Sequence, residues 1–470
     1  MISKTDFLWF MDAPMHLWAR THGRLADQSP SAYAQHLMAQ GQQVESLGLQ
    51  YIEKFVLPDY EQAELVWQQA YDDGQYEIRV DALIHDLTAN AWDLYEIKST
   101  TSVKKEYELD ITFQALILEQ LLSLRGAFLL HINRDYRHQD PLDLEGLFML
   151  EEISQSVADR RASVAAARED ARAVAQMQSP GLDLACTKPR TCPCPDLCHP
   201  GLPAHAIYDL PYIGKKVREL RKMGVTAIED FPANFSLNSK QRKHARAVKS
   251  GQPVIDRPAI RESLENLSYP LYFLDYETYA PALPFFSGYH PYEHIVFQYS
   301  LFVISHPGEE PKHYECLLTE PEDPAPKLVP HLLNNLGPEG SVIVWNQSFE
   351  AHRNLELAGH CPDYAGRLIG INDRLFDLMK VFKDGYYVHP DFHGSASLKA
   401  VLPVLCPDLG YEDLAIGQGE EAMLAWYWIV SGRIPDESIA EYETNLKAYC
   451  RMDTYGMITI LNKLREIIRS

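Results

Sequence analysis

The stretch PLYFLDYET (Pro270–Thr278) decides the fold of the C-terminal half of the chain. Its apolar run predicts a buried strand, and Asp275 and Glu277 stand near the end of that run. Because successive strand residues point to opposite faces, residues two positions apart share a face. The sequence therefore predicts a sheet that carries two carboxylates side by side at the end of one strand.

Two later stretches predict elements that would bring further side chains to this strand. Val342–Trp345 reads as a second buried strand, and Glu350 follows it near the positive end of the next helix. Tyr449 and Asp453 are four residues apart in a long helical run, so they share a helix face. Acids from separate elements can gather two divalent ions, one to activate water and one to stabilise the leaving oxygen, while a phenol hydrogen-bonds the nucleophile.

The order of these motifs resembles the DEDD exonucleases of the ribonuclease-H-like fold. The resemblance implies three metal ligands, Asp275, Glu277 and Asp453. It gives Tyr449 the role of orienting the water, and it indicates the tyrosine subtype because Ala448 stands where the histidine subtype has histidine. Glu350 takes the second-motif position, where the family usually has aspartate, so a slightly retracted helix or an indirect contact is expected. Asp377 reads as a helix-cap or surface acid, and Lys399, in a turn that leads into a helix, is a candidate phosphate contact.

Alternating residues in the first half predict two strands of a hairpin, one from Glu77 to Ala82 and one that ends at Lys98. Asp81 lies on the first strand, and Glu96 shares a face of the second strand with Lys98. Two carboxylates near a lysine can hold a hard divalent ion, while the ammonium group steadies an attacking water and the charge that develops on phosphorus. From these residues alone, an amphipathic hairpin with a solvated charged face is the alternative.

A polar helix face follows, because Asp110 and Gln114 are four residues apart. The whole run resembles the PD-(D/E)xK core of RecB-family nucleases. The resemblance implies that Asp81 and Glu96 are metal ligands, that Lys98 is the catalytic lysine and that Gln114 is the glutamine of the helix motif. Leu118 stands where this motif usually has tyrosine. Glu45 is a candidate for the family's upstream acidic ligand, with a surface glutamate as the alternative.

Four cysteines lie within thirteen residues: Cys186, Cys192, Cys194 and Cys198. Four thiolates can hold a tetrahedral zinc ion or a four-iron cluster. RecB-like relatives with an iron–sulfur cluster add a cysteine near the N-terminus, and Ala13 stands at that place here. Either Cys194 supplies the fourth ligand, or the site is incomplete, holds another metal or has lost it. His199 is a further candidate donor, and free thiols or a disulfide are the alternatives without metal.

The length, 470 residues and 53.6 kDa, predicts two or three domains, and the mixture of helical and strand patterns indicates the α/β class. Helical patterns cover Ser31–Glu53 and Glu61–Ala70. We expect a restriction-endonuclease-like (PD-(D/E)xK) domain, a basic helical connector and a ribonuclease-H-like domain, at residues 1–205, 206–262 and 263–470. No stretch is apolar for long enough to span a membrane, and the cysteine cluster fits a reducing compartment, so a cytoplasmic protein without membrane contact is expected.

The charge pattern bears on the partner. The net charge of −22 argues against nonspecific coating of nucleic acid, whereas residues 211–250 hold ten Lys or Arg against three acids. This basic island would guide a strand between the two centres. The two halves together resemble a bacterial family of fused nucleases.

These patterns predict a nuclease that hydrolyses phosphodiester bonds in DNA or RNA with Mg2+ or Mn2+. Because DEDD centres trim three-prime ends, exonuclease action on single strands is expected, with a 4Fe–4S cluster or Zn2+ at the cysteines. One alternative is a nucleic-acid-binding or defence-complex scaffold with one or both centres degenerate, which Ala13, Leu118 and Glu350 keep open. Another is a metal-clamped adaptor without a nucleic-acid role, which requires the acids to be unclustered.

Overall fold

The apolar run that precedes Asp275 forms strand β10 (Leu271–Tyr279), in agreement with the sequence pattern. The computed structural model describes residues 1–25, 29–232 and 234–469. The chain divides into a first unit, residues 1–201 and 281–293, and a second unit, residues 202–280 and 294–470. The connector predicted over residues 206–262 therefore lies within the second unit. Each unit combines a five-stranded sheet with helices, so the chain is of the mixed α/β class.

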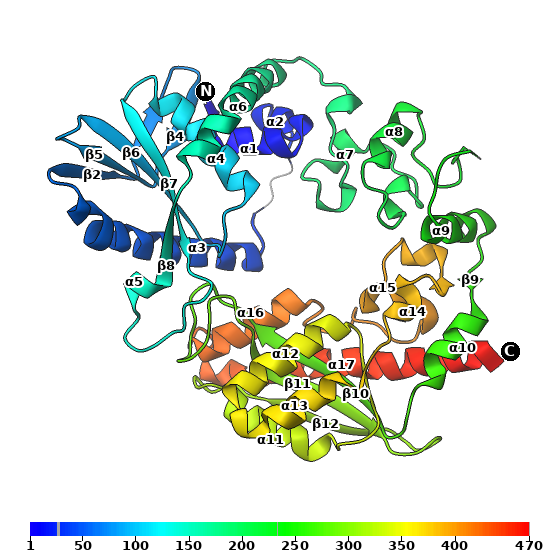
Figure 1. Ribbon diagram of the computed structural model, residues 1–470. Coiled ribbons are helices and arrows are strands. Elements are labelled where there is room, and N and C mark those ends of the chain that lie inside the picture. Colours follow the sequence, from blue (N-terminus) through cyan, green and yellow to red (C-terminus); the bar gives the residue numbers. More distant parts are fainter. Residues whose placement is uncertain (26–28, 233, 470) are drawn as a thin grey trace. The chain divides into compact units, whose positions relative to one another are not determined.

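The main sheet of the first unit has the strand order β2-β5-β6-β7-β8 (Figure 1). Strands β6 and β7 are parallel, and the other neighbours are antiparallel. Its strands are β2 (Ala63–Trp67), β5 (Ala82–Asp86), β6 (Ala91–Lys98), β7 (Leu124–Ile132) and β8 (Phe148–Glu152). The helix predicted over Glu61–Ala70 is wrong, because this stretch forms β2 and pairs with β5, and sheet pairing overrides the local pattern.

Helices cover both faces of this sheet. Leu83, Leu94 and Leu129 pack into one core with residues of α1 (Lys4–Asp12), α4 (Lys105–Leu118) and α6 (Ser154–Ala175). Ile84, Tyr95 and Leu130 pack into the other core with residues of α3 (Ala32–Tyr51). Because strand residues alternate, Glu96 and Lys98 share the face of Leu94 and point toward α4.

The first unit also contains a small three-stranded sheet with the strand order β1-β4-β3. Its β4 strand ends at Arg79, and β5 begins at Ala82 in the main sheet. One continuous strand from Glu77 to Ala82 is therefore a wrong prediction, and Asp81 lies in the bend where the chain passes from one sheet to the other.

The remaining elements of the first unit are β1 (Ile2–Ser3), β3 (Ala70–Asp72), β4 (Tyr76–Arg79), α2 (Pro14–Thr21), α5 (Leu144–Leu147), α7 (Pro195–Cys198) and the short turns η1 (Ile52–Val56), η2 (Leu57–Asp59), η3 (Leu182–Leu184) and η4 (Pro189–Thr191).

The sheet of the second unit has the order β12-β11-β10-β13-β14. Strand β10 is antiparallel to β11 and parallel to β13, and β13 is parallel to β14. The other strands of this sheet are β11 (Ile295–Ile304), β12 (Lys312–Leu317), β13 (Ser341–Val344) and β14 (Leu375–Asp377). The central strand β10 thus joins an antiparallel half of the sheet to a parallel half.

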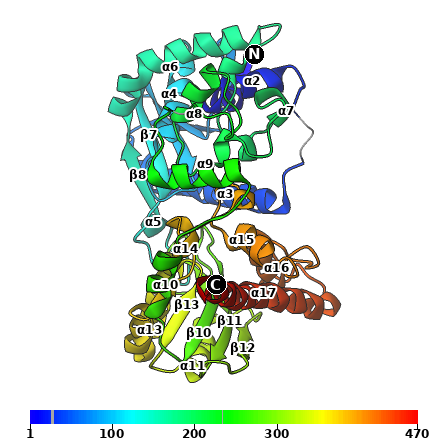
Figure 2. The ribbon, with the colours of Figure 1, turned by 90° about the vertical axis from the view of Figure 1, so that its right-hand side faces the viewer.

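This sheet also separates two cores. Tyr272 and Leu274 of β10 pack with residues of α11 (Ala325–Asn335), α12 (Gln347–His360) and α13 (Ala365–Asn372). Leu271 and Phe273 pack with residues of α10 (Arg257–Glu265), α14 (Lys380–Lys383), α15 (Leu398–Leu405) and the long helix α17 (Asp436–Arg469). Alternation therefore places Asp275 and Glu277 on the α17 side, which Figure 2 shows alongside β10 and β11.

The basic island contains two helices, α8 (Lys216–Lys222) and α9 (Ser239–Ser250). A short sheet follows, in which β9 (Val254–Ile255) pairs with β15 (Tyr387–Val388). The second unit also contains α16 (Gly419–Val430) and the turns η5 (Ile207–Asp209), η6 (Pro362–Tyr364) and η7 (Pro390–Phe392). Within the described ranges, no helix is both long and apolar enough to cross a membrane.

A glycine makes the parallel pairing of β10 and β13 sterically feasible. Gly340 directly precedes β13 with a φ of +88°, and a Cβ atom there would lie 2.1 Å from the Pro270 carbonyl oxygen. We expect Gly340→Ala to destabilise the protein by roughly 2–5 kcal/mol, because it adds a backbone clash to an unfavourable left-handed conformation. Chemical denaturation measures this change.

Gly308→Ala is the matched control. Gly308 has a φ of +84° with nothing within 4 Å of the added Cβ, so only the conformational cost of about 1 kcal/mol remains. Equal losses in the two variants would contradict the proposed clash.

Candidate functional site

The first group of candidate residues gathers where β6 meets α4. Lys98 Nζ lies 2.5 Å from Glu96 Oε1 and 2.9 Å from Asp110 Oδ2. Gln114 Nε2 donates to Glu96 Oε2 at 2.7 Å and to Asp110 Oδ1 at 3.0 Å. Asp81 Oδ2 accepts a hydrogen bond of 2.8 Å from the Ile97 backbone N–H. The structure thus brings together the four predicted residues of this centre, and we name Asp81, Glu96, Lys98 and Gln114 the first centre.

Lys4 was missed by sequence reasoning. Its Nζ lies 3.0 Å from Glu96 Oε1 and 3.6 Å from Asp110 Oδ1. Helix α1 carries this lysine to the same carboxylates that Lys98 contacts. Since Lys4 and Glu96 are 92 residues apart, no local pattern links them. The first centre therefore has two lysines, one of which no motif predicts.

These charges set the ionisation of the first centre. Burial and the neighbouring Glu96 raise the pKa of Asp81 to about 8. Burial works against the charge of Glu96 as well, but Lys4 and Lys98 hold the pKa of Glu96 below its usual range. Burial and Glu96 raise the pKa of Asp110. Glu96 is thus balanced by two ammonium groups, whereas Asp81 favours its protonated form at neutral pH.

Two further predictions concern the surroundings of the first centre. Glu45 accepts a hydrogen bond from Gln68, and burial and the charge of Glu96 raise the pKa of Glu45. The charges of the first centre therefore act on the Glu45 carboxyl group. Among the described hydrogen bonds and ion pairs, Glu45 contacts Gln68 and not Lys4 or Lys98. Leu118 is fully buried in the core between the sheet and the helices, so it is packed as a core residue.

The second group gathers where β10 meets α17, and we name Asp275, Glu277, Tyr449 and Asp453 the second centre. Oxygens of Asp275 and Glu277 and the Sγ atom of Cys450 all lie within 4.8 Å of one another. Tyr449 and Asp453 come from one face of α17, as their spacing predicts, and burial and the charge of Asp453 raise the pKa of Tyr449.

Burial and mutual repulsion dominate the electrostatics of the second centre. Burial, followed by the charges of Asp453, Glu277 and Glu350, raises the pKa of Asp275 well above its usual range. Burial and Asp453 do the same to Glu277, and burial raises the pKa of Asp453 to about 6. Such a group of buried oxygens is the ligand set that hard divalent cations prefer.

Three neighbours of the second centre were not predicted as part of it. Tyr411 donates a hydrogen bond to Asp453 Oδ1, and the Cys450 thiol donates to Asp275 Oδ2 at 3.7 Å. Lys399, predicted only as a phosphate contact, has its Nζ 5.1 Å from the ring centroid of Tyr449 and 5.3 Å from that of Tyr411. Its positive charge lowers the pKa of Asp453 and Glu277 against the larger effect of burial.

Glu350 lies in the first turn of α12, beside the end of β13. Its charge acts on Asp275, and burial and Asp377 raise the pKa of Glu350 to about 8. Glu350 Oε2 and Asp377 Oδ1 are buried and have no hydrogen-bond partner among the described residues. A buried oxygen without a partner is costly, and a cation or water bound there would remove that cost.

The cysteine cluster takes a partner from the N-terminal helix pair. Nε2 or Nδ1 of His16, on α2, and the Sγ atoms of Cys186, Cys192 and Cys198 all lie within 4.8 Å of one another. Cys194 is outside this set, although its Sγ lies 3.7 Å from that of Cys198, and His199 Nε2 lies 3.2 Å from Cys186 Sγ. Three sulfurs and one imidazole nitrogen are a suitable ligand set for zinc or an iron–sulfur cluster.

Ala13 is buried in the same hydrophobic group as these cysteines. His16 lies three residues after it, on α2, so a histidine from the N-terminal helices reaches the cysteine cluster. A histidine in an apolar helix gives no metal signal by itself, which explains why sequence reasoning did not select it.

Parts of this chain are similar in sequence to known proteins. The model of a family described as "Domain of unknown function (DUF2779)" matches residues 272–397, which include β10 and Glu350. "Uncharacterized protein MG366" of Mycoplasma genitalium is 25% identical over 214 residues, which are 42% of this chain and 32% of that protein. "Uncharacterized protein UU173" of Ureaplasma parvum is 22% identical over 56% of this chain and 41% of that protein. The chain thus matches well under half the length of these relatives.

Among solved structures, SSO0001 is similar to 38% of this chain and 77% of its own, with a TM-score of 0.23 and 18% identity. A TM-score this low carries no argument about the fold or the activity.

The contrast between the two centres predicts opposite effects of neutralising one acid in each. Without metal, Asp275→Asn should raise the melting temperature by about 2–4 °C per kcal/mol of repulsion removed. Glu96→Gln should instead cost about 3–5 kcal/mol, because Lys4 and Lys98 lose the carboxylate that both contact most closely and keep Asp110 as their shared partner. Scanning calorimetry in EDTA measures both changes, and a lower melting temperature for Asp275→Asn would contradict the repulsion.

The His16 contact generates a separate prediction. We expect His16→Ala to lower the zinc or iron that is retained per chain after anaerobic purification, whereas Cys194→Ser retains more metal than Cys192→Ser. His22→Ala, at the C-cap of the same helix, is the matched control. Elemental analysis measures the metal, and full retention in His16→Ala would contradict a role for this imidazole.

Proposed function

We propose that the chain is a metal-dependent nuclease that trims single-stranded DNA or RNA from three-prime ends, with the second centre as its active centre. The observation that carries the proposal is the clustering of Asp275, Glu277 and Asp453 at one largely buried place, where the positive charge of Lys399 acts on Glu277 and Asp453. The motif order that resembles the DEDD exonucleases also supports it. We likewise propose that the units have restriction-endonuclease-like and ribonuclease-H-like architectures.

The donor set fits a divalent metal. Asp275, Glu277 and Asp453 would hold Mg2+ or Mn2+, and the unpartnered Oε2 of Glu350, whose charge acts on Asp275, offers a further oxygen. When bound, such an ion supplies Lewis-acid activation of water and stabilises charge on the leaving oxygen. Closely packed carboxylates with raised pKa values are what a divalent cation would stabilise most.

The chain's own residues have separate roles in this proposal. Tyr449, on the same helix face as Asp453, orients a water through its hydroxyl group, and Tyr411 donates a hydrogen bond that holds Asp453 in place. Lys399 offers a positive charge beside both tyrosine rings, where a phosphate oxygen would be stabilised. The exposed cations of the basic island, among them Arg218, Arg242 and Arg246, would attract the phosphate backbone.

The first centre favours a second candidate role, binding without cleavage. Lys4 and Lys98 both contact Glu96 Oε1, an oxygen that a metal ion would need. Their charges already compensate Glu96, and the buried Leu118 replaces the polar residue that the helix motif usually offers to a substrate. We propose that this unit binds nucleic acid and contributes little to hydrolysis.

A cleavage assay with variants of both centres tests these roles. Purified protein with Mg2+ or Mn2+ receives single and double strands of DNA or RNA, labelled at either end. We expect Asp275→Asn to lower cleavage by at least about 100-fold, and Lys98→Ala to change it by no more than about threefold. Asp436→Asn, an exposed acid on α17, is the control for the charge change.

The outcomes separate the proposals. Loss of cleavage in Lys98→Ala alone would transfer the activity to the first centre. Unchanged cleavage in the Asp275→Asn, Lys98→Ala double variant would reject both assignments, and undetectable cleavage by the unaltered protein on every substrate would favour the scaffold.

A further inference from the structure

A third group of metal-ligating side chains lies in the second unit, apart from every residue assigned above. Ligand atoms of His205, Asp209 and His393 all lie within 4.8 Å of one another. His393 Nδ1 lies 3.1 Å from Asp209 Oδ2, and the rings of His205 and His393 stack with centroids 5.2 Å apart. The three residues come from the segment just before the basic island and from the loop after β15, which are more than 180 residues apart in sequence.

The backbone is built for this close approach. Gly394 has a φ of +72°, and a Cβ atom there would lie 1.7 Å from the Asp209 carbonyl oxygen. His393 itself has a φ of 46°, in the left-handed region, where histidine, asparagine and aspartate are enriched among the residues other than glycine. In this backbone conformation the His393 ring lies against Asp209.

Two unpartnered nitrogens beside this group point to a missing ligand. His205 Nδ1 and His244 Nε2 are buried and have no hydrogen-bond partner in the part of the chain that the structure describes. His244, on α9, is only 3% exposed, and the charges of Asp209, His205 and His393 act on its ring. Two buried imidazole nitrogens without partners are unfavourable unless an ion or water binds them.

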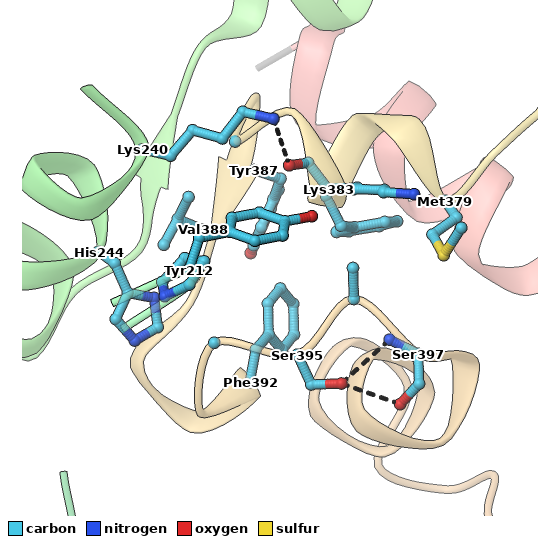
Figure 3. Close-up of a pocket in the computed structure, with 15 residues that line it drawn as sticks. Tyr212, Lys240, His244, Met379, Lys383, Tyr387, Val388, Phe392, Ser395 and Ser397 are labelled. Carbon is cyan, nitrogen blue, oxygen red and sulfur yellow. Dashed lines mark hydrogen bonds between the residues drawn. The ribbon is translucent and has the colours of Figure 1, made fainter. Parts of the chain in front are cut away.

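Figure 3 shows His244 at the margin of a cavity of about 380 Å3 that the loop after β15 also lines, through Phe392, Ser395 and Ser397. The cavity gives a solvent molecule room beside the His244 imidazole. The His393 side chain is 44% exposed, so the group can be reached from solvent.

We propose that His205, Asp209 and His393 bind a divalent transition-metal ion of the zinc type, with a solvent molecule completing the coordination. Imidazole nitrogens with one carboxylate favour zinc, nickel or cobalt over the hard magnesium ion, which prefers oxygen ligands. The ion would tie the segment just before the basic island to the loop that leads into α15, the helix of Lys399.

The test is metal stoichiometry in the full chain. Protein stripped with chelator is dialysed against Zn2+, and bound zinc per chain is measured by elemental analysis. The main variant is His393→Asn, because asparagine tolerates the left-handed backbone and can still hydrogen-bond Asp209 while it removes the imidazole. The control is His389→Ala, a histidine of the same loop outside the group.

We expect His393→Asn to bind one zinc ion fewer per chain, and the control to bind as much as the unaltered protein. Substituted Co2+ distinguishes this site from the cysteine cluster, since only the latter gives thiolate-to-metal charge-transfer absorption. His393→Asn should therefore lose cobalt absorption from the His205–Asp209–His393 site and keep the thiolate-to-cobalt charge-transfer band of the cysteine cluster. If His393→Asn binds as much zinc as the unaltered protein and has the same melting temperature, the proposal is overturned. His205→Gln repeats the test with the second histidine of the group.

Discussion

Repulsion between carboxylates that share one buried place is the constraint on which the rest of the second unit depends. Alternation along β10 forces Asp275 and Glu277 onto the same face, and α17 brings Asp453 to that face. Folding must therefore concentrate negative charge where water is scarce, at a cost that only protonation, hydrogen bonds or a cation can offset. Tyr411 donates a hydrogen bond to Asp453, and the positive charge of Lys399 acts on Glu277 and Asp453. These interactions offset part of the cost of clustering the acids.

The first unit also clusters buried acids, but there lysine side chains neutralise them. Lys4 and Lys98 lie among Glu96 and Asp110, so most of the compensation comes from the protein itself. A buried ion network of this kind adds little net stability but becomes costly when one partner is lost. The two units thus contain comparable acids in different electrostatic states, and this difference underlies our assignment of hydrolysis to the second centre.

Metal-ligating groups recur where segments that are distant in sequence must be held together. His16 of α2 meets the cysteine loop in the first unit, and His205 and Asp209 meet His393 in the second. The cysteine loop contains or adjoins the short turns η3 and η4, and the segments of Asp209 and His393 contain or adjoin the short turns η5 and η7. An ion can stabilise such segments with a few strong bonds where a large apolar core is not available.

The sequence by itself determined the relations that lie within one element. Two-residue spacing paired Asp275 with Glu277, and four-residue spacing paired Tyr449 with Asp453, because strand and helix geometry are local and periodic. Tertiary structure alone decided which elements meet. It ended β4 before Asp81, turned Glu61–Ala70 into an edge strand, and brought Lys4, His16, Tyr411 and His393 to their partners. Those contacts depend on packing between distant segments, which leaves no periodic pattern in the sequence.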